Sequence, residues 1–202
     1  MRLKSIKKIE DIIIGTSLNK KDDQLCDWMK KKNIRFVRHS PEDDLLGRVH
    51  QVSESNHFDY LVKINADCPL VDPILIENAL NQISRSERNF DIVTNRKIQT
   101  FPLGYSYEII SKNCINKCVK ENLTTLEKEL FVNWIFSNKN YKVKNISSKL
   151  NFKDINLCLD TEMDFILINE IYEKFWYSNN IFGLDDIKNF IMNNRKKYVF
   201  QK

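Results

Sequence analysis

Hydrophobic and polar positions follow two different periods along this chain. Short runs of apolar, often β-branched residues alternate with segments of about 10–14 residues in which apolar side chains recur every three or four positions. The runs predict strands over residues 12–17, 34–38, 59–67, 91–95, 105–110, 141–146 and 155–160. The longer segments predict helices over residues 21–32, 43–56, 73–83, 114–121, 126–137, 162–176 and 184–193, and residues 3–10 look like the last turns of another helix.

Strands that alternate with helices are typical of βαβ units and a mainly parallel sheet. We therefore predict an α/β protein with a three-layer, Rossmann-like fold. The sequence contains no internal repeat, linker or low-complexity segment, so we predict a single domain over residues 1–202. A chain of 202 residues is long enough to bury a substantial core.

Composition narrows the range of partners. The net charge is +5, but Lys and Arg are spread along the chain and form no compact basic patch, which argues against nucleic-acid binding. A modest positive charge suits an anionic nucleotide or sugar acid. No apolar run approaches the length of a membrane span or of a secretory leader, and the five cysteines include no Cys-x-x-Cys pair. These features predict a cytoplasmic protein with reduced cysteines and no membrane partner.

Asp67 is the most informative acidic residue. It ends the apolar run of residues 59–67, and Pro69 prevents the strand from continuing. Ligands of open α/β sheets bind beyond the carboxyl ends of strands, where a carboxylate can hold a divalent metal against a phosphate. The alternative is that Asp67 caps a helix beginning near Val71. Both readings stay open at this point.

Asp160 repeats this pattern later in the chain. It follows the apolar run of residues 155–159, and Thr161 and Glu162 open a helix behind it. Two carboxylates at strand tips can share one Mg²⁺ whose other ligands are phosphate oxygens and water. Asp-Thr-Glu before an apolar helix is also a good N-cap sequence, so capping is again the alternative.

Three further charged residues are candidates for ligand binding. Arg48 can hold a phosphate or carboxylate with two parallel hydrogen bonds, or it can be a solvated or ion-paired helix residue. Lys63 lies four residues before Asp67, on the same face of the expected strand, and can neutralise phosphate or pair with that carboxylate. Glu108 is either a ligand-binding acid or a solvent-facing strand residue.

Several motifs occur in the same order as in a known family. They are residues 12–17, 44–48 (Asp-Leu-Leu-Gly-Arg), 67–73 (Asp-Cys-Pro-Leu-Val-Asp-Pro), 94–95 (Thr-Asn), 101–104 (Phe-Pro-Leu-Gly) with Glu108, and 160–164 (Asp-Thr-Glu-Met-Asp). With these motifs the chain resembles the CMP-sugar-acid synthetases. That cytidylyltransferase family includes acylneuraminate and KDO cytidylyltransferases and a branch linked to spore-coat polysaccharide synthesis.

The resemblance implies a nucleotide-diphospho-sugar transferase version of the Rossmann-like fold. It also implies an enzyme that transfers CMP from CTP to a sugar acid and releases pyrophosphate, in surface polysaccharide biosynthesis. By this likeness Asp67 and Asp160 hold the Mg²⁺ cofactor and act in catalysis. Residues expected to bind the nucleotide or the sugar are Arg48, Lys63, Asn95, Gly104 and Glu108.

The chain departs from the family pattern at its N-terminus. Family members begin with a strand, a basic Gly-containing loop around the triphosphate and a helix, whereas this chain resembles them from the end of that helix onward. We expect one βα unit, on the order of 30 residues, to be missing, which would leave an N-terminally truncated sheet with unpaired strand edges. In addition, Lys63 stands where the family usually has Arg.

Three alternatives to the complete enzyme follow from this departure. The chain can be a non-catalytic binding subunit, or one part of a split protein that another chain or a second copy in a homodimer completes. It can also be a glycosyltransferase that uses a ready-made nucleotide sugar, because paired acids and Mg²⁺ serve that chemistry too.

Overall fold

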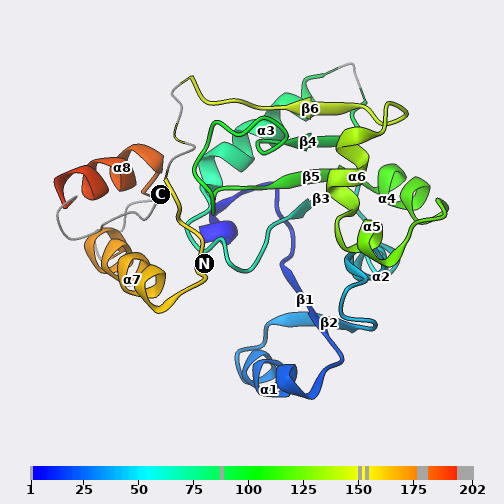
Figure 1. The fold of residues 1–202 in the computed structure, drawn as a ribbon, viewed down its shortest axis with the longest axis horizontal. Helices are drawn as coiled ribbons and strands as arrows, with labels where there is room; N and C mark the ends of the chain where they lie inside the picture. Colours follow the sequence, from blue (N-terminus) through cyan, green and yellow to red (C-terminus); the bar gives the residue numbers. More distant parts are fainter. Residues whose placement is uncertain (1, 87–88, 150–151, 153–154, 177–181, 195–202) are drawn as a thin grey trace.

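The computed structural model describes residues 2–86, 89–149, 152, 155–176 and 182–194. Its strands form two separate sheets, a small one near the N-terminus and a larger one in the body of the molecule (Figure 1). In the small sheet, β1 (Ile13–Ser17) pairs in parallel with β2 (Arg35–His39). The 3-10 turn η2 (Lys20–Asp22) and helix α1 (Asp23–Lys31) connect these strands. The first expected βαβ unit is therefore confirmed.

The larger sheet has the strand order β3-β5-β4-β6. Its strands are β3 (Tyr60–Lys63), β5 (Glu108–Ser111), β4 (Ile92–Thr94) and β6 (Val143–Asn145). β5 is antiparallel to both of its neighbours, while β4 and β6 are parallel. It follows that β3, β4 and β6 run in one direction and that β5 alone is reversed.

Helices cover both faces of the larger sheet. Ile92 and Ile110 lie on one face and pack against α2 (Leu45–Glu54), α4 (Lys112–Cys118) and α6 (Phe131–Ser137). Their sequence neighbours Val93 and Ile109 lie on the other face, where they pack against α3 (Pro73–Ser84). Because successive strand residues point to opposite faces, this alternation separates the two layers of helices. The predicted three-layer α/β fold is confirmed.

A second hydrophobic core lies beside the larger sheet. It is formed by α7 (Glu162–Trp176) and α8 (Leu184–Asn193), which pack against buried residues such as Leu70 and Tyr105. The buried Arg2 side chain, from the 3-10 turn η1 (Arg2–Ser5), fastens the start of the chain to this region. It donates to the carbonyl oxygens of Val71 at 3.0 Å and Phe182 at 2.9 Å, and its guanidinium lies over the Phe182 ring.

Several helix predictions need correction. The expected helix over residues 126–137 is wrong, because α5 (Thr125–Glu129) and α6 are separated at Leu130, whose φ of −101° and ψ of 29° are not helical. In the segment 3–10, the helical turn is limited to η1. Helix α3 begins at Pro73, as the apolar pattern predicted, so the alternative start near Val71 is wrong. Among the described residues, none of the helices combines the length and the apolar character needed to cross a bilayer.

Two strand predictions also differ from the structure. β3 ends at Lys63, not at Asp67, because its partner β5 begins only at Glu108. β5 cannot start earlier, since the Tyr107 amide donates to the Asn95 side chain instead. The expected strand over residues 155–160 is wrong as well. It is reduced to a single bridge between Leu103 and Asn156, and Gly104, with a φ of 83°, turns the chain away immediately afterwards.

The two sheets leave strand edges unpaired. Among the described strands, β1 pairs only with β2, and β3 pairs only with β5. The edges of β1 and β3 that face away from these partners therefore have no ladder, in agreement with the unpaired strand edges expected from the sequence. Unpaired strand edges are ready to accept another strand.

Hydrogen exchange should reveal these open edges. We expect the amides of alternate residues in β1 and β3 to exchange far faster than those of β4, because β4 is paired on both sides and fully buried. Residue-resolved exchange by NMR measures this directly. Equal protection in β1, β3 and β4 would mean that these edges are closed in solution.

Candidate functional site

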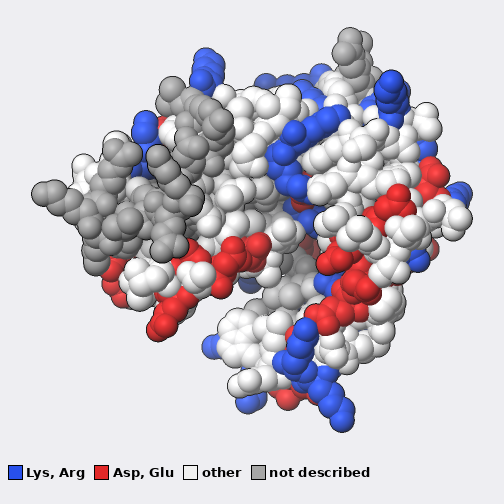
Figure 2. Space-filling model, in the orientation of Figure 1, with Lys and Arg blue, Asp and Glu red and all other residues white. Residues whose placement is uncertain are grey.

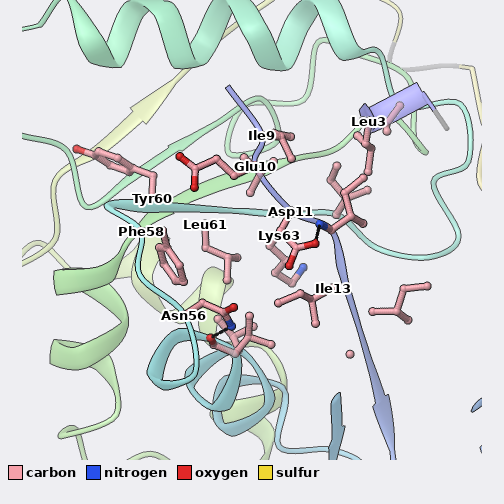
Figure 3. Close-up of a pocket in the computed structure, with 18 of the residues that line it drawn as sticks. Leu3, Ile9, Glu10, Asp11, Ile13, Asn56, Phe58, Tyr60, Leu61 and Lys63 are labelled. Carbon is pink, nitrogen blue, oxygen red and sulfur yellow. Dashed lines mark hydrogen bonds between the residues drawn. The ribbon is translucent and has the colours of Figure 1, made fainter. Parts of the chain in front are cut away.

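A large cavity lies between β1 and β3. Its volume is about 1790 Å³, beyond the roughly 300–1,000 Å³ of ordinary small-molecule pockets. Figure 2 shows a recess between the small-sheet region, lower in that view, and the rest of the molecule, with acidic side chains on both sides. In Figure 3, Ile13 of β1 and Leu61 and Lys63 of β3 lie around the same space. The polar residues of the lining include Gly15, Arg48, Lys63, Asn65 and Asp67.

Asp67 lies in the loop after β3, at the wall of this cavity. Its half-buried carboxylate accepts a hydrogen bond from the Cys68 thiol, at 3.3 Å between Sγ and Oδ1. The residue that caps α3 is Asp72, whose side chain accepts from the Ile74 amide at 2.8 Å. Burial raises the pKa of this capping carboxyl group. The capping interpretation of Asp67 is therefore wrong, and its carboxylate is available to a ligand.

The segment that carries Asp160 lies beside the Asp67 backbone. The Leu159 amide donates to the Asp67 carbonyl oxygen at 2.9 Å, which places the two acidic segments side by side. At the start of α7, Thr161 and Asp164 satisfy each other's hydrogen-bonding groups. No hydrogen bond to the Asp160 carboxylate occurs among the described residues. The exposed Asp160 side chain therefore does not cap α7, and within the described part of the chain it has no hydrogen-bond partner.

Lys63 and Glu108 face each other across the β3–β5 ladder. Their side chains form an ion pair of 3.2 Å, and Lys63 also donates to Asn65 at 2.7 Å. Glu108 is 3 % exposed and additionally binds Arg96, which donates from Nε. The expectation of a solvent-facing Glu108 is wrong, and so is a pairing of Lys63 with Asp67. The three groups carry two positive charges and one negative charge, so the cluster keeps a net positive charge beside the cavity.

Arg48 extends from α2 into the cavity. Asp44 caps that helix by accepting from the Gly47 amide at 2.7 Å, and this cap fixes where Arg48 emerges. Arg48 donates from Nη2 to the Glu42 carbonyl oxygen at 2.6 Å, while its Nε is buried without a hydrogen-bond partner. Its aliphatic stem packs so closely on Gly15 that an added Cβ there would lie 2.9 Å from Arg48 Cδ. Its guanidinium charge at the cavity lining makes Arg48 a candidate to bind an anion.

At the C-terminal end of β1, the polar groups of Thr16 and Ser17 are hydrogen-bonded locally. The hydroxyl groups of Ser17 and Thr16 both donate to the Asp22 carboxylate at 2.6 Å, and the Ser17 amide adds a third bond at 3.0 Å. These donors lower the pKa of Asp22 to about 2. The polar side chains of Thr16 and Ser17 are thus hydrogen-bonded to the turn that leads into α1.

Asn95 and Gly104, which were expected to bind the nucleotide or the sugar, have structural roles in this protein. Asn95 is 1 % exposed, and its amide group donates to the Tyr105 carbonyl and accepts from the Tyr107 amide, at 2.9 and 3.1 Å. Gly104 has a left-handed backbone and packs directly against the backbone of Leu157 and Cys158. Asn95 therefore holds the start of β5 in place, Gly104 packs against the segment around residue 158, and neither lines the cavity.

Substitution of Gly104 by alanine should be strongly destabilising. A Cβ at this position would lie 2.4 Å from the Leu157 carbonyl carbon, and the φ of 83° disfavours any L side chain. We expect a loss of about 2–4 kcal/mol in the free energy of unfolding, measured by urea denaturation. A matched Gly183→Ala variant, whose added Cβ meets only a side-chain oxygen at 3.1 Å, should lose much less. Equal losses in the two variants would contradict this assignment.

Two cysteines contact the acidic site, which the sequence alone did not indicate. Donor atoms of Asp67, Cys68 and Cys158 all lie within 4.8 Å of one another. Cys68 is buried and Cys158 is half-buried, and burial raises the pKa of both thiols, that of Cys158 to about 11. Arg96, the second partner of Glu108, was also missed. The spacing of Cys158 and Asp160, two residues apart in an extended segment, is the only signal that could have suggested the cysteine.

No protein-family model matches the chain. The chain is 30% identical over 177 residues to the uncharacterized protein MJ1063 of Methanocaldococcus jannaschii, a match that covers 86% of this chain and 70% of the relative. It is 23% identical over 172 residues to the spore coat polysaccharide biosynthesis protein SpsF of Bacillus subtilis, covering 83% of this chain and 69% of SpsF.

Solved structures show the same fold. A cytidylyltransferase from Leptospira borgpetersenii superposes with a TM-score of 0.89 at 22% identity, over 100% of this chain and 84% of that one. A CMP:2-keto-3-deoxy-manno-octonic acid synthetase, solved in complex with CTP, superposes with a TM-score of 0.61 at 8% identity, over 86% of this chain and 85% of the other. The chain therefore belongs to the same family as MJ1063, and its fold is that of the cytidylyltransferases.

Proposed function

We propose that this protein binds CTP and Mg²⁺ at the polar end of the cavity and transfers CMP to a sugar acid. The observation that carries the proposal is the hydrogen bond between the Leu159 amide and the Asp67 carbonyl. It places side by side the backbone segments that carry two carboxylates, which are distant in sequence and cap neither of the helices following them. Similarity to a CTP-bound synthetase and to SpsF supports the choice of nucleotide and of the polysaccharide pathway.

The carboxylates of Asp67 and Asp160 are suitable ligands for Mg²⁺. Mg²⁺ binds oxygen ligands and is usually held by one or two carboxylates together with phosphates and water. Asp67 and Asp160 offer such oxygens from adjacent backbone segments. Bound there, Mg²⁺ would neutralise phosphate charge that develops during transfer. The fit rests on the carboxylates alone and needs no rearrangement of the α3 or α7 caps.

The protein's own cations would position the triphosphate. Arg48 offers its guanidinium charge at the cavity wall, and the Lys63–Glu108–Arg96 cluster supplies a net positive charge. In the proposed reaction an oxygen of the sugar acid attacks the α-phosphorus of CTP, a new P–O bond forms, and the bond to the leaving pyrophosphate breaks. Positioning and charge stabilisation provide most of the catalysis in phosphoryl-type transfer.

Pyrophosphate release tests this function. The chain is incubated with CTP, Mg²⁺ and a panel of sugar acids, and the expected result is pyrophosphate release that depends on one acceptor and on Mg²⁺. UTP in place of CTP tests the choice of base. Release at the no-enzyme rate with every acceptor would overturn the catalytic proposal.

One observation favours a second candidate, a nucleotide-binding subunit that another polypeptide completes. The cavity is larger than a nucleotide pocket requires, and the unpaired edges of β1 and β3 border it. A strand added between them would fill the apolar part of the lining by pairing with both edges. A chain that is monomeric and turns over CTP unaided would exclude this candidate, whereas CTP binding without turnover would favour it.

A further inference from the structure

The cluster of Asp67, Cys68 and Cys158 has the composition of a site for a soft metal. Its two sulfurs and one carboxylate come from two segments, the loop after β3 and the extended stretch before α7. Thiolate ligands favour Zn²⁺ over the hard cations Mg²⁺ and Ca²⁺, which prefer oxygen. Three protein ligands with an open fourth position is a common arrangement for Zn²⁺.

The geometry is close to what such an ion requires. Zn–S bonds are about 2.3 Å long, so two sulfurs on one tetrahedral Zn²⁺ lie about 3.8 Å apart. The three donor atoms already lie within 4.8 Å of one another, and the Cys68 sulfur and the Asp67 oxygen are separated by 3.3 Å. Closing the set around an ion therefore needs side-chain movement of about 1 Å.

The surrounding backbone holds the donors in place. The Leu159 amide is bonded to the Asp67 carbonyl oxygen, and the Cys158 amide donates to the Asn156 side chain at 3.0 Å. Gly104 packs against the backbone at Leu157 and Cys158. Cys158 is half-buried and Asp67 lines the cavity, so an ion can reach the cluster from solvent. The other cysteine pair, Cys114 and Cys118, belongs to α4 and is buried in the core, and no described His, Asp or Glu completes a set of three donors with it.

We infer that Asp67, Cys68 and Cys158 form a binding site for a thiophilic divalent cation of the Zn²⁺ type. The ion takes the place of the two thiol protons, which pass to solvent, and leaves one coordination position open. The site does not need a nucleotide. It shares Asp67 with the proposed Mg²⁺ site, so occupancy by Zn²⁺ would remove one oxygen ligand from Mg²⁺. That last consequence alone rests on the proposed function.

Cadmium titration tests the site directly. The full chain, kept reduced with a phosphine and free of nucleotide, is titrated with Cd²⁺ while the thiolate-to-metal absorption is recorded. We expect saturation at one Cd²⁺ per chain. Cys158→Ser and Asp67→Asn should each weaken binding about tenfold or more. Cys114→Ser is the matched control and should leave the titration unchanged.

The outcomes separate the site from the proposed function. Absence of saturable absorption, or a titration that survives Cys158→Ser and is lost in Cys114→Ser, would overturn the metal site. Thermal melting of each variant shows whether it is folded, and Cys158→Ser should fold because the side chain is only half-buried. If Cd²⁺ binds as expected and CTP does not bind at all, the metal site stands and the nucleotide proposal fails. If both bind, Zn²⁺ should weaken Mg²⁺-dependent CTP binding in the wild type and much less in Cys158→Ser.

Discussion

Replacing Glu108 with alanine should destabilise this protein more than any other single change of an acidic residue. Glu108 is the shared partner of two cations, Lys63 at 3.2 Å and Arg96, and its side chain is 4 % exposed. Removing it would leave Lys63, whose side chain is 11 % exposed, without its counter-charge. Breaking a buried ion pair in this way typically costs about 3–5 kcal/mol, a large share of the roughly 5–15 kcal/mol that stabilises a domain.

Urea denaturation followed by circular dichroism measures this loss. Glu108→Gln should lose less, because the amide still accepts a hydrogen bond from either cation. Glu129→Ala is the matched control: this exposed glutamate at the end of α5 should change stability by no more than about 0.5 kcal/mol. If Glu108→Ala unfolds within about 1 kcal/mol of the wild type, the ion-pair cluster does not hold β3 to β5 as described.

The second large effect is expected at Asp67. Asp67→Asn keeps the shape of the side chain but removes the charge that Mg²⁺ requires. We expect the Mg²⁺-dependent affinity for CTP to fall about tenfold or more, equivalent to about 1.4 kcal/mol. Stability should change by less than about 1 kcal/mol, because the carboxylate contributes one hydrogen bond with Cys68 and caps no helix.

Isothermal titration with CTP, in the presence and absence of Mg²⁺, separates the two effects. Asp27→Asn makes the same change of charge on the exposed face of α1, where the carboxylate is 66% exposed, and should leave both affinity and stability unchanged. An Asp67→Asn protein that binds CTP with an unaltered dependence on Mg²⁺ would remove Asp67 from the metal site.

Much of the fold was predictable from local patterns. Helices α1, α2, α3, α7 and α8 lie where the apolar periodicity placed them, because amphipathic spacing is enough to define a helix that covers a core. The secondary-structure predictions fail where the conformation of a segment depends on contacts with another segment. Residues 155–160 have a strand-like pattern, but an extended segment becomes a strand only when a neighbour continues the ladder, and Gly104 ends it. The break at Leu130 likewise has no signal such as Gly or Pro.

The candidate site was likewise predictable where the signal is local and unpredictable where it depends on tertiary contacts. Asp67 and Asp160 were recognisable because each acid ends an apolar run, whereas only the coordinates show that Asp72, and not Asp67, caps α3. The pairing of Lys63 with Glu108 depends on the register of two antiparallel strands that lie 45 residues apart in the chain. The approach of Cys158 to Cys68 is longer-ranged still. Contacts of this kind are set by tertiary packing and leave no local pattern in the sequence.

The most direct test of the central claim is a crystal structure of the chain with CTP and Mn²⁺ in place of Mg²⁺, in which anomalous scattering locates the metal. The proposed function predicts one manganese ion per chain at about 2.2 Å from carboxylate oxygens of both Asp67 and Asp160, with CTP phosphate oxygens completing its shell. A manganese ion bound to the nucleotide but distant from both carboxylates, or a nucleotide bound outside the cavity between β1 and β3, would contradict it.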